Sequence, residues 1–239
     1  MRNIWPYIVG FVLLVGVAFA LYNGISTGET VPESGTQTRS PSKAKSDKDA
    51  ERKVSPDASF SEITIDKTDL IVGNENAPVT IIEYSSLTCP HCSDFHKKVL
   101  PVIKREFVDT NKVRLIYRDF PLDQWALKAS IIARCAGPKR RYRFIQTFFL
   151  QQEQWTSGDP AAGLVALAKL GGLTTSSLEK CLSDKQMIDS VIKERLAATK
   201  QFAIRSTPTI IVNGDLYSGG LDIEQLRSVI EEKLKIPKG

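Results

Sequence analysis

The stretch 79–92, Val-Thr-Ile-Ile-Glu-Tyr-Ser-Ser-Leu-Thr-Cys-Pro-His-Cys, decides the fold of this chain. Its first part is an almost continuous run of β-branched and aromatic side chains, which is typical of a strand buried on both faces. A helical pattern begins at Cys89 and continues to about Val108, with apolar residues at helical spacing. We therefore expect a buried strand that leads directly into a helix, with two cysteines at the junction.

The sequence after this stretch predicts a mixed α/β sheet with helices inserted in its middle. Pro101 predicts a kink in the helix that follows the cysteines. A long helical region is expected from about 123 to 201, and Asn213-Gly214 is a strong hairpin signal. Further strands are expected at 113–117, 208–212 and 216–218, helices at 125–136 and 141–152, and a last helix from the cap residue Asp222 to about 234.

The N-terminus predicts export from the cytoplasm. Residues 4–22 carry no charge, and at about 1.5 Å per residue they just cross a hydrocarbon core of about 30 Å. Arg2 precedes this run, and Ala18-Phe19-Ala20 is similar to a signal-peptide cleavage site. Residues 1–24 are therefore either an uncleaved inner-membrane anchor or a cleaved signal peptide, and both place the rest of the chain outside the cytoplasm.

Residues 25–59 are predicted to be a disordered linker. They consist mainly of Gly, Ser, Thr, Pro and charged residues, and they cannot bury enough apolar surface to offset their ordering entropy. Such a segment is either a flexible tether that lets a domain reach substrates away from the membrane or an unstructured leader with no role.

The formal net charge of +5 does not indicate a nucleic-acid partner. Basic residues are spread along the chain, and apart from 139–143 they form no cluster or stripe with interleaved aromatic residues. The four cysteines permit two disulfides, and an exported location would allow them to form.

Cys89 and Cys92 carry the predicted chemistry. One helical turn separates them, which brings the two sulfurs within disulfide distance. The free N–H groups and the dipole of a helix N-terminus favour a thiolate at Cys89, Pro90 fits the first turn, and His91 adds a donor. Because these effects stabilise the reduced form, the pair is expected to be an oxidant.

In the expected reaction a substrate thiolate attacks Cys89, and Cys92 is the buried resolving residue. Two other interpretations of the pair remain open. The pair could be half of a zinc or copper site, with His91 and His96 as nitrogen ligands, or it could be a purely structural disulfide. The absence of a second Cys-x-x-Cys motif from the sequence counts against the metal site, and no metal is expected.

Two features away from the cysteines are candidates for the same site. Glu83 lies inside the apolar strand, where a carboxylate is costly unless it is needed. A buried acid beneath the pair, with a raised pKa, could relay the proton of Cys92, unless a strand edge exposes it instead. Pro208 opens a predicted strand, so Thr207-Pro208 is a candidate cis peptide bond that could leave the Thr207 backbone free to pair with an extended substrate.

Cys135 and Cys181 fall on separate predicted helices of the insertion. In an exported protein we expect them to form a structural disulfide, which would stabilise the fold by about 4 kcal/mol in the chain-entropy model. A redox-active relay and free buried thiols are the remaining interpretations.

The run from Glu83 through Cys89-Pro90-His91-Cys92, followed after the helices by Thr207-Pro208-Thr209 and Asn213-Gly214, resembles the DsbA-like family of thiol–disulfide oxidoreductases. The resemblance implies a thioredoxin fold formed by residues 60–122 and 201–239, with a helical insertion at 123–200. It also implies that Cys89 is nucleophilic, that Glu83 is the buried acid of the family, and that Pro208 is a cis-proline beside the disulfide.

The same resemblance implies the reaction and its participants. The substrates would be reduced exported proteins, the redox centre would be the Cys89–Cys92 disulfide with no other cofactor, and a DsbB-like, quinone-linked membrane oxidase would regenerate the disulfide. One departure concerns Thr207, because the best-known oxidases of the family have an aliphatic residue there and related isomerases often have threonine. We therefore expect a disulfide-introducing oxidase, with a disulfide isomerase or reductase as the first alternative and a metal-delivery module as the second.

Overall fold

The computed structural model of the protein describes residues 56–61 and 63–235. The predicted anchor or signal peptide at 1–24 and most of the predicted linker at 25–59 lie outside these residues. Within the described ranges, no helix has the length and apolar character needed to cross a membrane.

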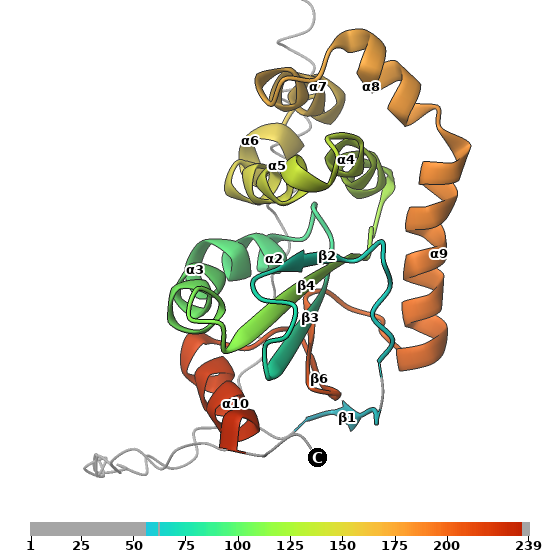
Figure 1. Cartoon of the computed structure of the whole chain (residues 1–239). Helices are drawn as coiled ribbons and strands as arrows, with labels where there is room; N and C mark the ends of the chain where they lie inside the picture. Colours follow the sequence, from blue (N-terminus) through green and yellow to red (C-terminus); the bar gives the residue numbers. More distant parts are fainter. Residues whose placement is uncertain (1–55, 62, 236–239) are drawn as a thin grey trace, which may run out of the picture. The chain divides into compact units, whose positions relative to one another are not determined.

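The described residues contain a six-stranded mixed sheet with the order β1-β6-β5-β3-β4-β2 (Figure 1). Only β3 and β4 are parallel to each other, and the other neighbouring pairs are antiparallel. The expected mixed sheet is confirmed. The strands are β1 (Ala58–Ser59), β2 (Leu70–Val72), β3 (Val79–Ser85), β4 (Val113–Asp119), β5 (Thr209–Val212) and β6 (Asp215–Ser218).

β3 is buried on both faces, as its sequence predicts. Ile81 packs in an apolar cluster with residues of the following helix and of α10 (Ile223–Lys235), while Ile82 and Tyr84 pack on the opposite face. Because side chains alternate along a strand, Glu83 shares the face of Ile81 and points toward the helix that carries the cysteines. The strand thus both anchors the core and aims a carboxylate at the predicted site.

The helix after β3 differs from the single kinked helix that the sequence predicts. It consists of α2 (Pro90–Asp94), the π-helical turn η1 (Phe95–Val99), α3 (Leu100–Ile103) and a second π-helical turn, η2 (Lys104–Val108). Pro101 lacks an N–H and its ring crowds the preceding turn. The wider turn η1, in which the N–H of Leu100 bonds to the carbonyl of Phe95, precedes the proline and accommodates it.

The helical insertion is confirmed between β4 and β5. In Figure 1, α4 to α8 gather beyond one end of the sheet, and α9 returns along its side toward β5. The helix predicted at 141–152 begins earlier, since Pro138 occupies its first turn after Gly137. The helices are α4 (Gln124–Cys135), α5 (Pro138–Leu150), α6 (Gln152–Thr156), α7 (Pro160–Leu170), α8 (Thr175–Leu182) and α9 (Lys185–Phe202).

The two short strands near the start of the described region, β1 and β2, are not predicted from the sequence. Strand β1 pairs with β6, so the predicted linker 25–59 is wrong at its end, where Ala58 and Ser59 already belong to the sheet. β2 pairs with β4 at the other edge. Strands of two and three residues are too short to show an alternating pattern, and only their partners define them.

The C-terminal elements follow the sequence closely. The Asn213-Gly214 turn has a positive φ at both residues, which is the geometry that a two-residue hairpin requires. The N-terminus of α10 is capped reciprocally, because Asp222 accepts from the N–H of Gln225 and the Gln225 side chain accepts from the N–H of Asp222. In the insertion, a disulfide joins Cys135 at the end of α4 to Cys181 on α8, with Cα atoms 6.0 Å apart.

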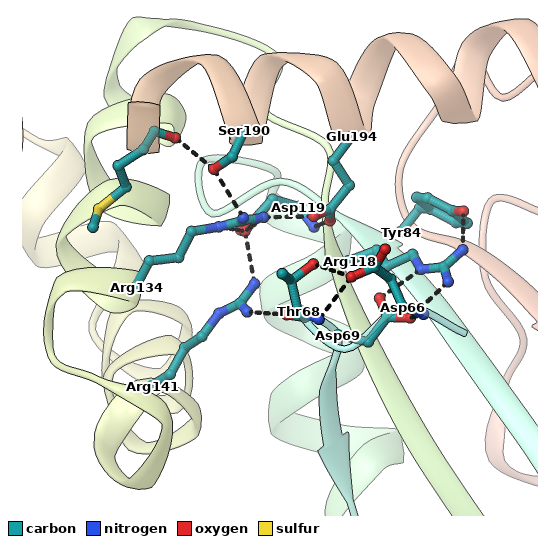
Figure 2. A network of polar contacts seen from close by, with 11 residues as sticks. Asp66, Thr68, Asp69, Tyr84, Arg118, Asp119, Arg134, Arg141, Ser190 and Glu194 are labelled. Carbon is teal, nitrogen blue, oxygen red and sulfur yellow. Dashed lines mark hydrogen bonds and ion pairs between the residues drawn. The ribbon is translucent and has the colours of Figure 1, made fainter. Parts of the chain in front are cut away.

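A buried ionic network joins the insertion to the sheet (Figure 2). Asp119, at the end of β4, accepts from Arg134 of α4 at 2.6 Å and from Arg141 of α5 at 3.0 Å. Arg134 also pairs with Glu194 of α9 at 2.6 Å, and the N–H of Asp119 donates to the same carboxylate at 2.5 Å. Three helices of the insertion therefore converge on one strand end.

Burial and the neighbouring charges together set the pKa values of the two carboxyl groups in this network. Burial alone would raise the pKa of Asp119, but Arg134 and Arg141 outweigh it and hold this pKa below its usual range. Burial and the neighbouring Asp119 raise the pKa of Glu194 to about 7. Beside the network, Arg118 pairs with both oxygens of Asp69 at 2.9 and 2.7 Å and so ties β4 to the segment before β2.

Replacing Arg134 by methionine removes the cation shared by the buried Asp119 and the partly buried Glu194 and leaves both carboxylates short of a partner. We expect Arg134→Met to lower the free energy of unfolding by about 3 kcal/mol, measured by urea denaturation. The exposed Arg143 of α5 provides a matched control, and Arg143→Met should change stability by less than about 0.5 kcal/mol. Equal stabilities of the two variants would contradict this role of the network.

Candidate active site

The loop between β3 and α2 is held in place by the helical insertion. Gln152 of α6 donates to the carbonyls of Leu87 and Cys89 at 2.8 and 2.9 Å. The Thr88 hydroxyl donates to Asp123, the cap residue of α4, at 2.6 Å. Residues far along the chain thereby fix the backbone on which the first cysteine sits.

Cys89 is the cap residue of α2 and Cys92 lies in its first turn, as the sequence predicts. Both are free thiols; Cys89 keeps 7% of its surface exposed, and Cys92 keeps none. The Cys89 thiol donates to the carbonyl of Thr207 at 3.3 Å, and the Thr207-Pro208 peptide bond is cis. The structure therefore places the carbonyl of Thr207, one of the two predicted substrate-binding residues, against the first cysteine, and Pro208 follows Thr207 through the cis peptide bond.

The surroundings of Cys89 stabilise its thiolate. Its pKa is lowered from the ordinary range of a free thiol to about 5, chiefly because the Cys92 thiol donates a hydrogen bond to the sulfur. Partial burial opposes this shift, while the Thr207 hydroxyl and the backbone N–H groups of Cys92 and His91 support it. The expectation of a thiolate at the helix N-terminus agrees with this geometry.

The pKa of Cys92 is shifted in the opposite direction. Burial raises the pKa of its thiol far above the ordinary value, and the hydrogen bond to Cys89 and the nearby Glu83 carboxylate add to the rise. The hydroxyl of Ser85, which is itself fully buried, opposes it weakly. The surroundings therefore favour the thiolate form of Cys89 and strongly favour the thiol form of Cys92.

Glu83 lies beneath the pair. The interpretation in which a strand edge exposes it is wrong, because β3 lies between β5 and β4 and Glu83 is 0% exposed. Both of its oxygens lie within hydrogen-bond distance of Nε2 of His96, at 2.9 and 3.0 Å. The other ring nitrogen of His96 lies 2.8 Å from Nε2 of Gln146 on α5.

The two remaining predicted catalytic residues, Pro90 and His91, lie at the surface. Pro90 and His91 are exposed at the start of α2, so the His91 ring faces solvent and its backbone N–H faces the Cys89 sulfur. His96 is buried against Glu83 and is not gathered with His91 around the cysteines. Among the described residues, no three His, Cys, Asp or Glu side chains are grouped as a metal site would require.

Most of the polar residues that complete the site give no signal in the sequence. Ser85, His96, Gln146 and Gln152 are polar residues in apolar or amphipathic surroundings, and their roles depend on contacts between distant segments. Only His96 carries a readable clue, since it follows Cys92 by four residues and therefore lies on the same helix face.

Comparison with known proteins agrees with this geometry. A family profile described as Thioredoxin matches residues 65–232. A protein-disulfide oxidoreductase of Rickettsia bellii is 31% identical over 176 residues, which cover 73% of this chain and 68% of that protein. The crystal structure of Wolbachia pipientis alpha-DsbA1 has a TM-score of 0.67 and 28% identity, covering 72% of this chain and 93% of that chain.

The chain belongs to the DsbA-like disulfide oxidoreductases of the thioredoxin family. Disulfide bond formation protein D of Bacillus subtilis is a more distant relative, with 26% identity over 69% of this chain and 77% of that protein. The match to a Rickettsia conorii protein-disulfide oxidoreductase spans 63% of that protein's length. As in other DsbA-like proteins, the chemistry is thiol–disulfide exchange.

A pH titration of the reduced protein tests the asymmetry of the pair. The ultraviolet absorbance of the Cys89 thiolate should appear with a midpoint at about 5. Cys92→Ala should move this midpoint upward, because the hydrogen bond from Cys92 makes the largest contribution, and Cys89→Ser should abolish the transition. A wild-type midpoint near the unshifted value of about 8.5 would contradict the assignment.

The same shift predicts how the stability of the reduced protein depends on pH. Because the pKa of Cys89 is depressed in the folded state, the stabilisation is complete above the unfolded-state pKa of about 8.5 and is lost as the pH falls through about 5. The unfolding free energy of the reduced protein, relative to that of Cys89→Ser, should therefore rise between these two pH values. A difference that is independent of pH over this range would refute the linkage.

Proposed function

We propose that this protein introduces disulfide bonds into exported proteins through its Cys89–Cys92 pair. The proposal rests on the opposite pKa shifts of the two thiols: the pKa of Cys89 is lowered to about 5, and that of Cys92 is raised. A dithiol whose thiolate is stabilised prefers to be reduced, so its disulfide takes electrons from other thiols.

The reaction begins with the disulfide form. A substrate thiolate attacks the sulfur of Cys89, a new bond joins substrate and enzyme, and the electron pair of the broken bond passes to Cys92. A second substrate thiolate then attacks the substrate sulfur of the mixed disulfide and releases Cys89. The substrate leaves oxidised, and the enzyme keeps two electrons as a Cys89 thiolate and a Cys92 thiol.

Cys92 must gain a proton when it leaves, because its buried thiolate is strongly disfavoured. Glu83 is the buried acid on the same side of the sheet, and its proximity to Cys92 supports a role as proton donor and acceptor. The Thr207 carbonyl beside Cys89 is suited to pairing with the backbone of an extended substrate.

The identity of the residue before the cis-proline favours isomerase or reductase activity as the second candidate function. A threonine at position 207 places a hydroxyl beside Cys89, where an aliphatic side chain would place none. An isomerase needs the pair to remain reduced, whereas an oxidase must be reoxidised. For the oxidase we propose a quinone-linked membrane protein as the reoxidant, a location outside the cytoplasm, attachment through residues 4–22, and no cofactor besides the disulfide.

The oxidase assignment is tested with a reduced, unfolded substrate protein. The oxidised protein should transfer its disulfide to the substrate in a one-to-one ratio, and Cys89→Ser should transfer none. A Cys135→Ser/Cys181→Ser double variant should retain the transfer, since that second pair lies outside the site. The reduction potential should be clearly less negative than about −200 mV, and a value near about −270 mV would point to a reductant.

A further inference from the structure

We propose that His96 and Gln146 make Glu83 a buried proton store for Cys92. The store gives Cys92 a proton when it leaves the disulfide and takes that proton back when the disulfide reforms. The inference rests on the proposed function and deepens it, because it assigns two positioning residues to the acid that faces the resolving cysteine.

The geometry of the helix brings the partners together. His96 follows Cys92 by one helical turn, so both side chains project toward the sheet from the same helix face. There Glu83 meets His96 with both oxygens at 2.9 and 3.0 Å from one ring nitrogen. Glu83 and His96 are 0% and 1% exposed, so water does not compensate either group.

This pair can hold one proton in addition to that of a neutral imidazole. With the proton the pair is neutral overall, and without it the pair carries one negative charge. Before attack the disulfide and the protonated pair are both neutral, and the one negative charge arrives with the substrate thiolate. As the disulfide opens, this charge passes to Cys92, and the proton of the pair then moves to Cys92 and leaves the charge on the pair. Opening the disulfide above a pair that had already lost its proton would instead create two buried anions, which is the cost that the store avoids.

Gln146 allows the imidazole to change its protonation without losing a partner. Its Nε2 lies 2.8 Å from Nδ1 of His96, an arrangement in which an unprotonated Nδ1 accepts. If Nδ1 carries a proton, a half turn of the amide presents an oxygen acceptor instead. Gln146 is half-buried on α5, so the insertion supplies this adaptable contact.

The ring itself is held by aromatic side chains. Phe149 stacks on it at 4.0 Å between centroids, and Tyr117 and Phe95 present edges at 6.2 and 6.1 Å. Phe149 is in turn anchored to α2, because its carbonyl accepts from Ser93 at 2.8 Å. The imidazole therefore stays aimed at Glu83 through the reaction cycle.

The other titratable groups that face the pair stay neutral at physiological pH. Apart from Cys92 itself, they are Tyr117 on β4 and Tyr142 on α5. Burial raises the pKa of Tyr117 well above its ordinary value and that of Tyr142 to about 12. Beyond Tyr117 lies Asp119, whose charge is balanced by Arg134 and Arg141. None of these neighbours competes for the proton that Cys92 exchanges.

The step to measure is the resolution of a mixed disulfide between Cys89 and glutathione. In this step the Cys92 thiol loses its proton, attacks Cys89 and expels glutathione. We expect Glu83→Gln and His96→Phe each to slow this step by about tenfold or more. The double variant should be no slower than Glu83→Gln alone, because both residues serve one proton. The thiolate midpoint of Cys89 should stay unchanged in His96→Phe.

The pH profile separates a proton store from a structural contact. The wild-type rate should vary little near neutral pH, while in His96→Phe it should rise with pH because solvent must then remove the proton. His96→Gln keeps a donor for Glu83 but cannot carry the proton, so it should fold normally and still be slow. Gln146→Met should slow the step to a smaller extent, and the exposed Gln154→Met should not.

Several outcomes would overturn the inference. If Glu83→Gln is slow and His96→Gln resolves at the wild-type rate, His96 has no part in proton storage, although Glu83 keeps its proposed role. If the effects of His96→Phe and Glu83→Gln multiply in the double variant, the two residues act independently and the store does not exist. A wild-type rate in Gln146→Met would remove Gln146 from it. Failure of the proposed function is distinguishable, since it would appear as disulfide transfer by Cys89→Ser.

Discussion

The rest of the structure depends on one constraint. The sulfur of Cys89 must hold a negative charge at the start of a helix while the thiol of Cys92 stays buried beside it. The Cys92 thiol donates to Cys89, so the two sulfurs share one proton unequally. That division requires a helix N-terminus at Cys89 and complete burial of Cys92. A buried strand that ends directly before the helix supplies both conditions.

The helical insertion contributes to the site as well as covering it. Gln152 fixes the carbonyls of the loop that leads to Cys89, and Gln146 contacts the ring of His96. Both glutamines come from the consecutive helices α5 and α6, more than fifty residues from the cysteines in sequence. A shift of these two helices would therefore alter both the position of the nucleophile and the surroundings of the buried acid.

The ionic network at Asp119 explains how α5 keeps its position on the sheet. Arg141 belongs to the same helix as Gln146 and binds the end of β4, while Glu194 fixes α9 to the same strand end. Buried ion pairs contribute little net stability, but they require a single arrangement because every misplaced partner leaves a charge unpaired. We interpret the network as the contact that fixes the orientation of the insertion relative to the sheet.

The sequence by itself determined the elements and the reacting atoms. The run of β-branched residues before Cys89, the helical spacing after it and the Asn213-Gly214 turn depend on local backbone preferences, which neighbouring residues express directly. The spacing of Cys89 and Cys92 likewise sets their chemistry within one helical turn. The residues alone left the cis geometry before Pro208 and the proposed role of Glu83 as open alternatives, and the family resemblance favoured both.

Only the tertiary structure decided which polar residues serve the cysteines. Gln146, Gln152 and Ser85 are unremarkable in sequence, and His96 was considered there only as a possible metal ligand. The strands β1 and β2 are too short to show a pattern. Their roles arise from contacts between segments that the fold brings together, and the cost of burying a polar group without a partner selects those contacts. The residues next to a polar group in sequence do not show which distant residue will be its partner. The groups that surround the Cys92 thiol could therefore be identified only from the tertiary structure.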